Sequence, residues 1–286
     1  MPVEQVHRAD DPRVAGYRAV RDGELLRTLG LFVAEGRHIV RRVIEDDRYR
    51  VQSLFVNDAA LNGLELVLGL LDPHVPIFAG DAAVLAAVAG YEVHRGCLAL
   101  VHRPPPLSVD RLKESAAMLV VLEGVSNPDN VGGIFRNAAA FCADGVLLSP
   151  TCCDPLYRKA IRTSMGSTLA VPFARVDHGD WPRALTGLRI AGFTLVALTP
   201  REPSEPIESF VTRPRRERLA LILGTEGNGL TPAVEAAADR RVRISISDRV
   251  DSLNVAVAAA IALRELGRLR KPEGQDDSRP KGPHYE

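Results

Sequence analysis

A single arginine follows a loop rich in asparagine and glycine near the middle of the chain. The stretch VSNPDNVGGIFRNAAAF, residues 125–141, places Asn127, Asp129 and Asn130 ahead of two glycines, and Arg136 follows on a segment that predicts a helix. A guanidinium is permanently charged and donates hydrogen bonds in a fixed planar arrangement. Arg136 is therefore either a solvated surface charge or the partner of an anionic or reactive group at this helix end.

A second loop, LGTEGNGLTP at residues 223–232, carries three glycines between a predicted strand and a predicted helix. A P-loop needs Lys and then Ser or Thr after its last glycine, but Leu230 and Thr231 stand there, and Pro232 stands where a dinucleotide fingerprint needs its third glycine. Both nucleotide interpretations, including a dehydrogenase, fail on this spacing. What remains is either accessible glycine backbone with one carboxylate, Glu226, as a ligand site, or a tight turn with a solvated glutamate.

A third loop, ISISDRVDSLN at residues 244–254, leads into the last predicted helix. Ser252 is a good N-cap for that helix, and Asn254 then falls in its first turn, where an amide is a poor choice for packing alone. The free N–H groups at such a helix start can bind a ligand carboxylate or hydroxyl. An ordinary helix cap is the alternative interpretation.

These three loops follow strands of a predicted α/β domain over residues 115–270. Continuous apolar strands that alternate with helices indicate a parallel sheet with helices on both faces. Ligands of such sheets bind beyond the carboxyl ends of the strands, where the three loops begin. The predicted strands cover residues 116–124, 144–150, 169–176, 193–199, 218–224 and 240–246, and the helices cover 131–142, 155–165, 181–192, 231–239 and 252–270.

The proline run in HRPPPLS, residues 102–108, marks the boundary to a second and smaller domain. Strand and helix patterns also alternate before it, which predicts a compact α/β module. The predicted organisation is an N-terminal extension at 1–19, the small domain at 20–103, a linker at 104–114, the large domain at 115–270 and a disordered tail at 271–286.

The bulk composition excludes few functions but narrows the class of protein. The 286 residues carry 36 Lys and Arg and 36 Asp and Glu, so no global charge argues for nucleic acid, and none argues against a local basic face. Four cysteines without a C-x-x-C pair, scattered histidines, no signal peptide and no long apolar stretch predict a reduced cytoplasmic protein with no metal and no membrane span.

Taken together, the three loops resemble motifs of the SpoU, or TrmH-like, branch of the SPOUT RNA methyltransferases. The first is similar to that family's N-x-G-x-x-x-R motif, the second to L-G-x-E-G-x-G-L and the third to its S-L-N helix start, and RTSMGS at residues 162–167 also fits. The matching residues are Asn130, Gly132 and Arg136, then Leu223, Gly224, Glu226, Gly227, Gly229 and Leu230, and finally Ser252, Leu253 and Asn254.

The resemblance implies a carboxyl-terminal trefoil knot, S-adenosyl-L-methionine as cofactor, and a homodimer through the C-terminal domain whose active site is shared between subunits. Residues 20–103 look like the family's substrate-binding domain, an α/β RNA-binding module akin to a ribosomal-protein fold. The implied cofactor-binding residues are Leu223, Gly224, Thr225, Gly229, Ile244, Ile246 and Leu253. The implied catalytic residues are Arg136, Asn130, Glu226, Ser252 and Asn254.

The implied reaction is methylation of a ribose 2′-hydroxyl in structured RNA, with 23S ribosomal RNA favoured because of the small domain's resemblance. A tRNA 2′-O-methyltransferase and an inactive RNA-binding protein of the same fold are the alternatives. A charged guanidinium has no acceptor lone pair, so we expect Arg136 to hold an RNA phosphate and stabilise the developing alkoxide rather than act as a base.

The sequence departs from the family pattern at two places. Ser245 and Asp248 stand where the family often has Pro and Gly ahead of the S-L-N motif, which leaves the path of that loop open. Arg95 stands where the family often has Gln, and this replacement is either neutral or changes an RNA contact.

Overall fold

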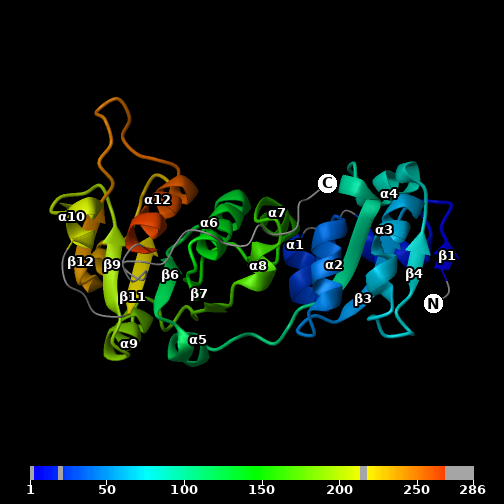
Figure 1. Ribbon diagram of the computed structural model, residues 1–286, viewed down its shortest axis with the longest axis horizontal. Coiled ribbons are helices and arrows are strands. Elements are labelled where there is room, and N and C mark those ends of the chain that lie inside the picture. The colour runs from blue at the N-terminus through cyan, green and yellow to red at the C-terminus, as the bar shows by residue number, and fades with distance from the viewer. Residues whose placement is uncertain (1–2, 19–21, 213–217, 268–286) are drawn as a thin grey trace, which may run out of the picture.

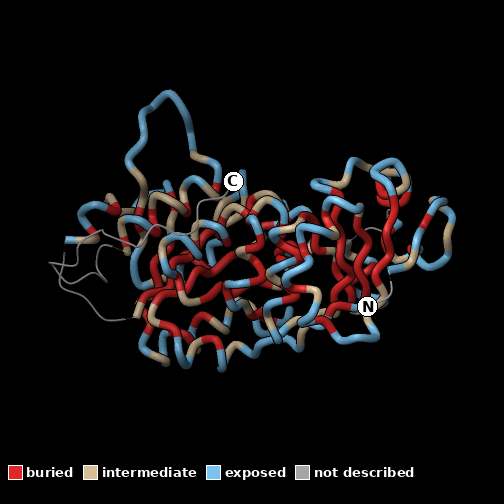
Figure 2. Tube along the Cα trace, turned by 45° about the vertical axis from the view of Figure 1, so that its right-hand side comes forward, coloured by how far each residue is buried: buried red, intermediate tan, exposed pale blue. Residues whose placement is uncertain are grey.

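Two β-sheets lie one after the other along the long axis of the molecule in the computed structural model, which describes residues 3–18, 22–212 and 218–267 (Figure 1). The larger sheet has seven strands and the smaller has five. Figure 2 shows that the buried residues run through the strands of both sheets. The loop between the last strand and the last helix is exposed and extends away from the rest of the molecule.

The larger sheet is parallel throughout, as the sequence predicts. Its order, β10-β12-β9-β11-β6-β7-β8, places β11 between β9 and β6, so strands distant in the chain become neighbours. Its strands are β6 (Met118–Leu122), β7 (Gly145–Leu148), β8 (Phe173–Arg175), β9 (Thr194–Leu198), β10 (Glu205–Pro206), β11 (Leu219–Leu223) and β12 (Arg240–Arg243).

Helices cover both faces of this sheet, because its buried strands point alternate side chains to opposite sides. In β6, Met118, Val120 and Leu122 face one apolar core, and Leu119 and Val121 face the other. The first core is covered by α6 (Pro128–Ala140), α10 (Ile207–Val211) and α12 (Val255–Gly267), and the second by α5 (Val109–Ser115), α9 (Ala184–Ile190) and α11 (Pro232–Ala237).

The predicted elements differ from the observed ones mainly at their ends. The predicted helix at 155–165 is shorter, as α7 (Arg158–Thr163), and a further helix, α8 (Ser167–Ala170), takes the start of the predicted strand at 169–176. The strand predicted at 240–246 ends at Arg243, so Ile244 to Ile246 belong to the loop.

The smaller sheet is mixed, in the order β1-β4-β3-β5-β2, with β5 antiparallel to β2 and β3. Its first strand comes from residues 1–19, which the sequence prediction left outside the domain: Val3 to Gln5 pair with β4, and Val14 and Tyr17 are buried in its core. The small unit therefore begins before residue 20. Its strands are β1 (Val3–Gln5), β2 (Leu31–Glu35), β3 (Val51–Val56), β4 (Ile77–Ala79) and β5 (Cys97–His102).

Helices and helical turns fill the connections of the small unit. Asn57 and Asp81 cap α3 and α4, and each side chain accepts a hydrogen bond from the first turn. The helices are α1 (Asp22–Glu24), α2 (Arg37–Glu45), α3 (Asp58–Leu68) and α4 (Ala82–Ala89), and the helical turns are η1 (Pro12–Tyr17), η2 (Leu25–Leu29) and η3 (His94–Gly96).

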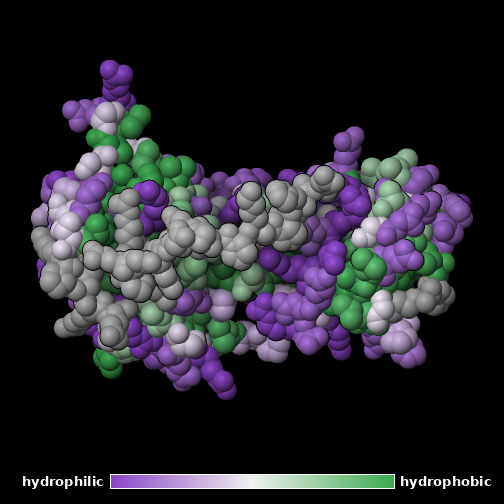
Figure 3. All heavy atoms as spheres, viewed as in Figure 1, coloured by the Kyte–Doolittle hydropathy of each residue, from purple (hydrophilic) through white to green (hydrophobic). Residues whose placement is uncertain are grey.

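The two units pack through α7, whose Ile161 is buried in the core of the small unit. Across the same junction Arg42 donates to the Gly166 carbonyl oxygen at 2.9 Å, and the Tyr49 hydroxyl donates to that of Leu169 at 2.8 Å. Hydrophilic side chains gather between the units on the face drawn in Figure 3. The predicted linker, 104–114, includes the first turns of α5.

The predicted disordered tail, 271–286, lies outside the described residues. Within the described part of the chain, no helix is long and apolar enough to cross a membrane. The same residues contain no group of three or more His, Cys, Asp or Glu side chains that could hold a metal ion.

Candidate active site

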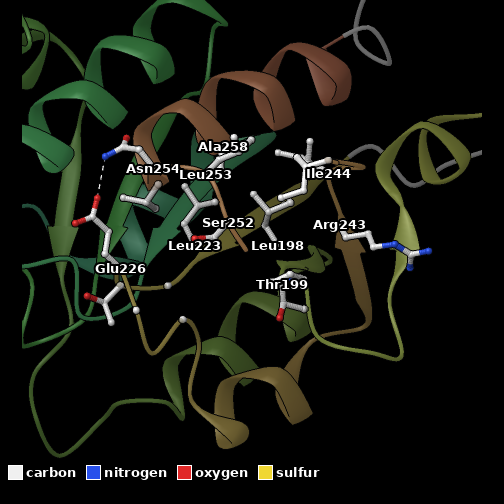
Figure 4. A pocket seen from close by; sticks show the side chains of 17 residues that line it. Leu198, Thr199, Leu223, Glu226, Arg243, Ile244, Ser252, Leu253, Asn254 and Ala258 are labelled. Atoms are coloured by element: carbon white, nitrogen blue, oxygen red, sulfur yellow. Dashed lines mark hydrogen bonds between the residues drawn. The ribbon is translucent and has the colours of Figure 1, made fainter. Parts of the chain in front are cut away.

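A cavity of about 360 Å³ opens at the carboxyl ends of β9, β11 and β12, beside the start of α12 (Figure 4). This is the edge of the sheet at which the sequence placed the site, and the volume lies in the range of small-molecule pockets. The cavity is lined by all seven residues predicted to bind cofactor and by three of the five predicted catalytic residues: Leu223, Gly224, Thr225, Gly229, Ile244, Ile246 and Leu253, with Glu226, Ser252 and Asn254.

The second loop has a shape that only glycine permits at Gly224. A Cβ atom there would lie 2.5 Å from the Gly229 carbonyl oxygen and 2.5 Å from the Leu230 nitrogen, because the loop folds back on its own start. Gly227 and Gly229 have φ values of +82° and +65°, in the left-handed region that glycine adopts without strain. The turn closes as the Gly229 N–H donates to the Thr225 carbonyl oxygen at 3.1 Å. The glycines of this loop therefore keep its backbone within reach of the cavity.

Two side chains outside the motifs form hydrogen bonds that fix the second loop in place. Glu123, at the end of β6, is buried, and its carboxylate accepts from the Thr231 N–H at 2.9 Å, the Thr231 hydroxyl at 2.8 Å and the Trp181 indole N–H at 3.2 Å. Arg201 donates to the carbonyl oxygens of Asn228 at 2.7 Å and Leu230 at 3.0 Å. The loop is thus tied to the sheet on two sides.

Replacing Glu123 by glutamine is expected to loosen this anchor. Either orientation of the amide turns its NH₂ group toward a donor, Thr231 or Trp181, and hydrogen bonds to a charged group contribute about 1.5–3 kcal/mol. We expect a fall in melting temperature of roughly 4–8 °C. The matched control is Glu114→Gln on the exposed side of α5, and equal melting temperatures for the two variants would contradict this assignment.

Asn254 connects all three predicted loops. Its amide nitrogen donates to Asn130 Oδ1 at 2.9 Å and to Glu226 Oε1 at 2.8 Å, and its Oδ1 accepts from the backbone N–H groups of Ala256 at 2.9 Å and Val257 at 3.3 Å. The first contact reaches a buried residue of α6, and the second crosses the cavity mouth, as the dashed line in Figure 4 shows. One side chain therefore fixes the three segments relative to one another.

The same contacts correct the predicted helix cap. The sequence assigns the N-cap of the last helix to Ser252, but α12 begins at Val255, and Asn254 accepts the hydrogen bonds that a cap residue takes. Ser252 is left exposed at the cavity rim. An amide can cap the helix and also donate to two further acceptors, which a serine hydroxyl with one proton cannot do.

The glycine pair after the first loop brings three helices together. A Cβ on Gly132 would lie 2.7 Å from the Ala160 carbonyl oxygen in α7, and one on Gly133 would lie 2.8 Å from the Ala256 Cβ in α12. Lys159 of α7 reaches back to Asp129 at 2.6 Å, and this hydrogen bond lowers the pKa of that carboxyl. The close approach positions Asn130 and Asn254 within hydrogen-bonding distance.

Arg136 does not line the cavity of its own chain. It lies exposed on α6, and no hydrogen bond or ion pair involves its side chain among the described residues. Of the five predicted catalytic residues, the structure therefore brings four together and leaves Arg136 on the surface. The first interpretation from sequence, a solvated charge, describes a single chain correctly.

One wall of the cavity has no counterpart among the predicted site residues. It follows β9, and the loop signal that marked the other segments is missing there, since LTPR carries no glycine and no motif. Its Thr199 hydroxyl donates to the buried Glu235 at 2.9 Å, which turns this polar group away from the cavity. Gly227 was matched to the second motif but not predicted as a site residue, and the lining residues that sequence reasoning missed are Leu198, Thr199, Pro200, Arg243, Val255 and Ala258.

Comparison with known proteins places this site in a family. The model of the SpoU rRNA Methylase family matches residues 117–264. An uncharacterised tRNA/rRNA methyltransferase from Mycobacterium bovis is 40% identical over 272 residues, covering 94% of this chain and 93% of the relative.

Solved structures share the fold over nearly the whole chain. An rRNA methyltransferase from Sinorhizobium meliloti has a TM-score of 0.79 at 24% identity, over 93% of this chain and 98% of that one. An AdoMet-bound rRNA methyltransferase from the same organism has a TM-score of 0.77 at 25% identity, over the same shares of each chain. With the three motifs gathered at one edge of the sheet and the family match spanning the larger sheet, this chain belongs to the SpoU rRNA methylase family.

Proposed function

We propose that this protein transfers a methyl group from S-adenosylmethionine to a ribose 2′-hydroxyl in folded RNA, with 23S ribosomal RNA as the favoured substrate. The observation that supports the proposal is the cavity at the carboxyl edge of the sheet, which is lined by all seven residues implied to bind the cofactor. These residues come from two loops, and α11 and β12 lie between the two loops in the chain. The AdoMet-bound relative of the same fold supports this cofactor.

The cavity fits such a cofactor in both shape and chemistry. Leu198, Leu223 and Leu253 supply apolar surface, and the backbone at Gly224 and Gly229 approaches without side chains in the way. When bound, the sulfonium supplies an already activated methyl group, so the protein has mainly to align the acceptor and assist its deprotonation. Glu226 and Asn254 lie at the mouth of the cavity, where they can orient the acceptor ribose.

The proposal includes a homodimer in which Arg136 acts on the cavity of the partner subunit. This assignment explains why a family motif places an exposed guanidinium on the surface of α6. Arg136 then holds an RNA phosphate and stabilises the developing alkoxide, a task that suits its planar donors. The trefoil knot implied by the family belongs to the same proposal.

The small unit is proposed to bind the RNA, and the cytoplasm is the proposed location. Two alternatives remain distinct from the main proposal: methylation of a tRNA ribose, which the naming of the mycobacterial relative keeps open, and an RNA-binding protein without catalysis. The intact contacts among Asn130, Glu226 and Asn254 favour catalysis over the second alternative.

Substitutions of Asn254 separate its structural role from its proposed catalytic role. Asn254→Asp keeps the acceptor that caps α12 but cannot donate to Asn130, and it repels Glu226. We expect methyl transfer to fall about tenfold or more although the cap of α12 is kept. Asn254→Ala also removes the cap, which costs about 1 kcal/mol. Thermal unfolding and tritium transfer from labelled S-adenosylmethionine measure the two effects, and full activity in Asn254→Asp would contradict the catalytic role.

Two measurements test the proposed function directly. Calorimetric titration with S-adenosylmethionine is expected to show saturable binding. If the protein does not bind S-adenosylmethionine, the proposed function is wrong. Mapping of 2′-O-methyl sites in total RNA, from cells with and without the gene, is expected to show one unmethylated position in 23S rRNA when the gene is absent. Such a position in tRNA supports the first alternative, and cofactor binding without any change in methylation supports the second.

A further inference from the structure

Arg201 follows the cavity wall at the end of β9, and it is not among the residues that line the cavity. Its guanidinium nevertheless contacts the glycine-rich second loop with both terminal nitrogens. Nη1 donates to the Leu230 carbonyl oxygen at 3.0 Å, and Nη2 donates to that of Asn228 at 2.7 Å. The planar donors of an arginine suit such a pair of neighbouring acceptors. Arg201 therefore holds the later part of the loop from outside the cavity.

A buried carboxylate orients Arg201. Glu235 of α11 is 7% exposed, and its Oε1 lies 3.5 Å from Arg201 Nη1. The same oxygen accepts from the Thr199 hydroxyl at 2.9 Å, and Thr199 Oγ1 accepts in turn from the backbone N–H of Arg201 at 3.2 Å. A carboxylate is costly to bury unless it has partners of this kind. Glu235 thus fixes Arg201 through both its side chain and its backbone.

The same set of contacts reaches the other walls of the cavity. Thr199 lines the cavity, and its N–H donates to the Val242 carbonyl oxygen at 2.9 Å, which joins the end of β9 to β12 (Figure 4). The chain after β12 continues into Ile244, which lines the cavity as well. Walls from β9, from the second loop and from the end of β12 are therefore linked by hydrogen bonds around Glu235 and Arg201.

The side chain proposed to orient the acceptor ribose is held separately. Glu226 lies earlier in the second loop, and its carboxylate accepts from the Asn254 amide at 2.8 Å. Arg201 contacts the later part of the loop, at Asn228 and Leu230. Loss of Arg201 is therefore expected to displace the backbone proposed to contact the cofactor more than the groups proposed to face the acceptor.

We propose that Arg201 is a positioning residue for cofactor binding, which holds the second loop against the end of β9 with the support of the buried Glu235. The inference rests on the proposed function, since it names what sets the affinity of the same cavity for S-adenosylmethionine. Arg201 lies outside the cavity, so it acts through the carbonyl oxygens of the loop and not by contact with the cofactor.

The test measures cofactor affinity and turnover separately in the full-length protein. Arg201→Ala is expected to raise the Kd for S-adenosylmethionine about tenfold or more in calorimetry, because two hydrogen bonds from a charged group are lost. The kcat at saturating cofactor, measured as tritium transfer to total RNA from cells that lack the gene, is expected to stay within about threefold. A Kd within twofold of the wild type would overturn the proposal, whether or not kcat falls.

The matched control is Arg189→Ala. The Arg189 side chain is 43% exposed, against 49% for Arg201, and it donates to the Ala237 carbonyl oxygen and pairs with Asp239 at 3.0 Å. None of these three residues lines the cavity. Its Kd for S-adenosylmethionine is expected to stay within about twofold of the wild type, since distant sites act independently. An equal loss of affinity in the two variants would reveal a general effect of removing a structural arginine and would overturn the proposal.

A double-mutant cycle tests whether Glu235 acts through Arg201. Glu235→Gln keeps the size of the side chain and an oxygen that can accept from Thr199, but it removes the charge that faces the guanidinium. We expect it to weaken cofactor binding about fourfold in the wild-type background, the size typical of a partly exposed ion pair, and less than twofold in the Arg201→Ala background. Equal factors in both backgrounds would contradict the link.

The calorimetric series also separates this inference from the proposed function. Absence of cofactor binding to the wild-type protein would refute both together. Binding to the wild type that Arg201→Ala leaves unchanged would refute the role of Arg201 alone.

Discussion

Replacing Arg136 by lysine is expected to lower methyl transfer to RNA about a hundredfold or more while the affinity for S-adenosylmethionine stays within about twofold. The reason is geometric: Arg136 lies outside the cavity of its own chain, and its proposed contacts at the partner's cavity are the RNA phosphate and the developing alkoxide, not the cofactor. A lysine keeps the positive charge but loses the planar pair of donors that can hold a phosphate and a developing alkoxide together. Single-turnover transfer of tritium measures the first quantity, and calorimetry the second.

The control for this substitution is Arg111→Lys on α5, an exposed arginine on the opposite face of the larger sheet. Its activity is expected to equal that of the wild type. If Arg136→Lys also keeps full turnover, the guanidinium has no role in the reaction.

Mixed dimers test whether Arg136 acts on the partner subunit. Neither an Arg136→Ala dimer nor a Gly224→Ala dimer is expected to be active, because each lacks one half of both sites. A purified heterodimer of the two variants contains one complete site, formed by the cavity of the first chain and the arginine of the second. We expect about half of the wild-type activity in that species. An inactive heterodimer would place both functions within one subunit.

The sequence was sufficient to predict which edge of the sheet carries the site. The carboxyl ends of parallel strands lie at the same edge of a sheet, and this does not depend on where the helices begin and end. Glycine-rich loops after 116–124 and 218–224, and the polar loop after 240–246, were sufficient to locate it. The wall after β9 could not be found this way, since its contribution arises from strand order: β9 lies between β11 and β12, and no local pattern encodes that.

The role of Asn254 illustrates a second limit. Its position in the sequence indicated an unusual helix start, but its amide could be assigned to the cap and to Asn130 only once α6 and α12 were in contact. That contact depends on Gly133, and nothing in the sequence indicates which neighbour this glycine of the predicted helix at 131–142 allows to approach. The strand Val3–Gln5 was missed for a different reason, because three residues with one apolar side chain carry no recognisable period.

Gly224→Ala is expected to weaken the binding of S-adenosylmethionine about a hundredfold, which corresponds to ~2.7 kcal/mol. The added methyl group would lie 2.5 Å from the Gly229 carbonyl oxygen and the Leu230 nitrogen, which are backbone atoms that cannot rotate away. The loop must therefore open at its base, against the hydrogen bonds from Arg201 that hold it closed. Since this loop forms one side of the cavity, its displacement removes the backbone surface proposed to contact the cofactor.

The control for Gly224→Ala must separate this local effect from a general effect of replacing glycine. Gly187→Ala lies inside α9, where no described atom beyond the neighbouring residues and the helix's own backbone lies within 4 Å of the added methyl group. The substitution is expected to stabilise the helix by roughly 0.5–1 kcal/mol. Its cofactor affinity should match that of the wild type. Thermal unfolding checks that Gly224→Ala remains folded, since the strand order and the helices on both faces do not depend on this loop. Normal cofactor binding by a folded Gly224→Ala protein would mean that the cofactor does not occupy this cavity.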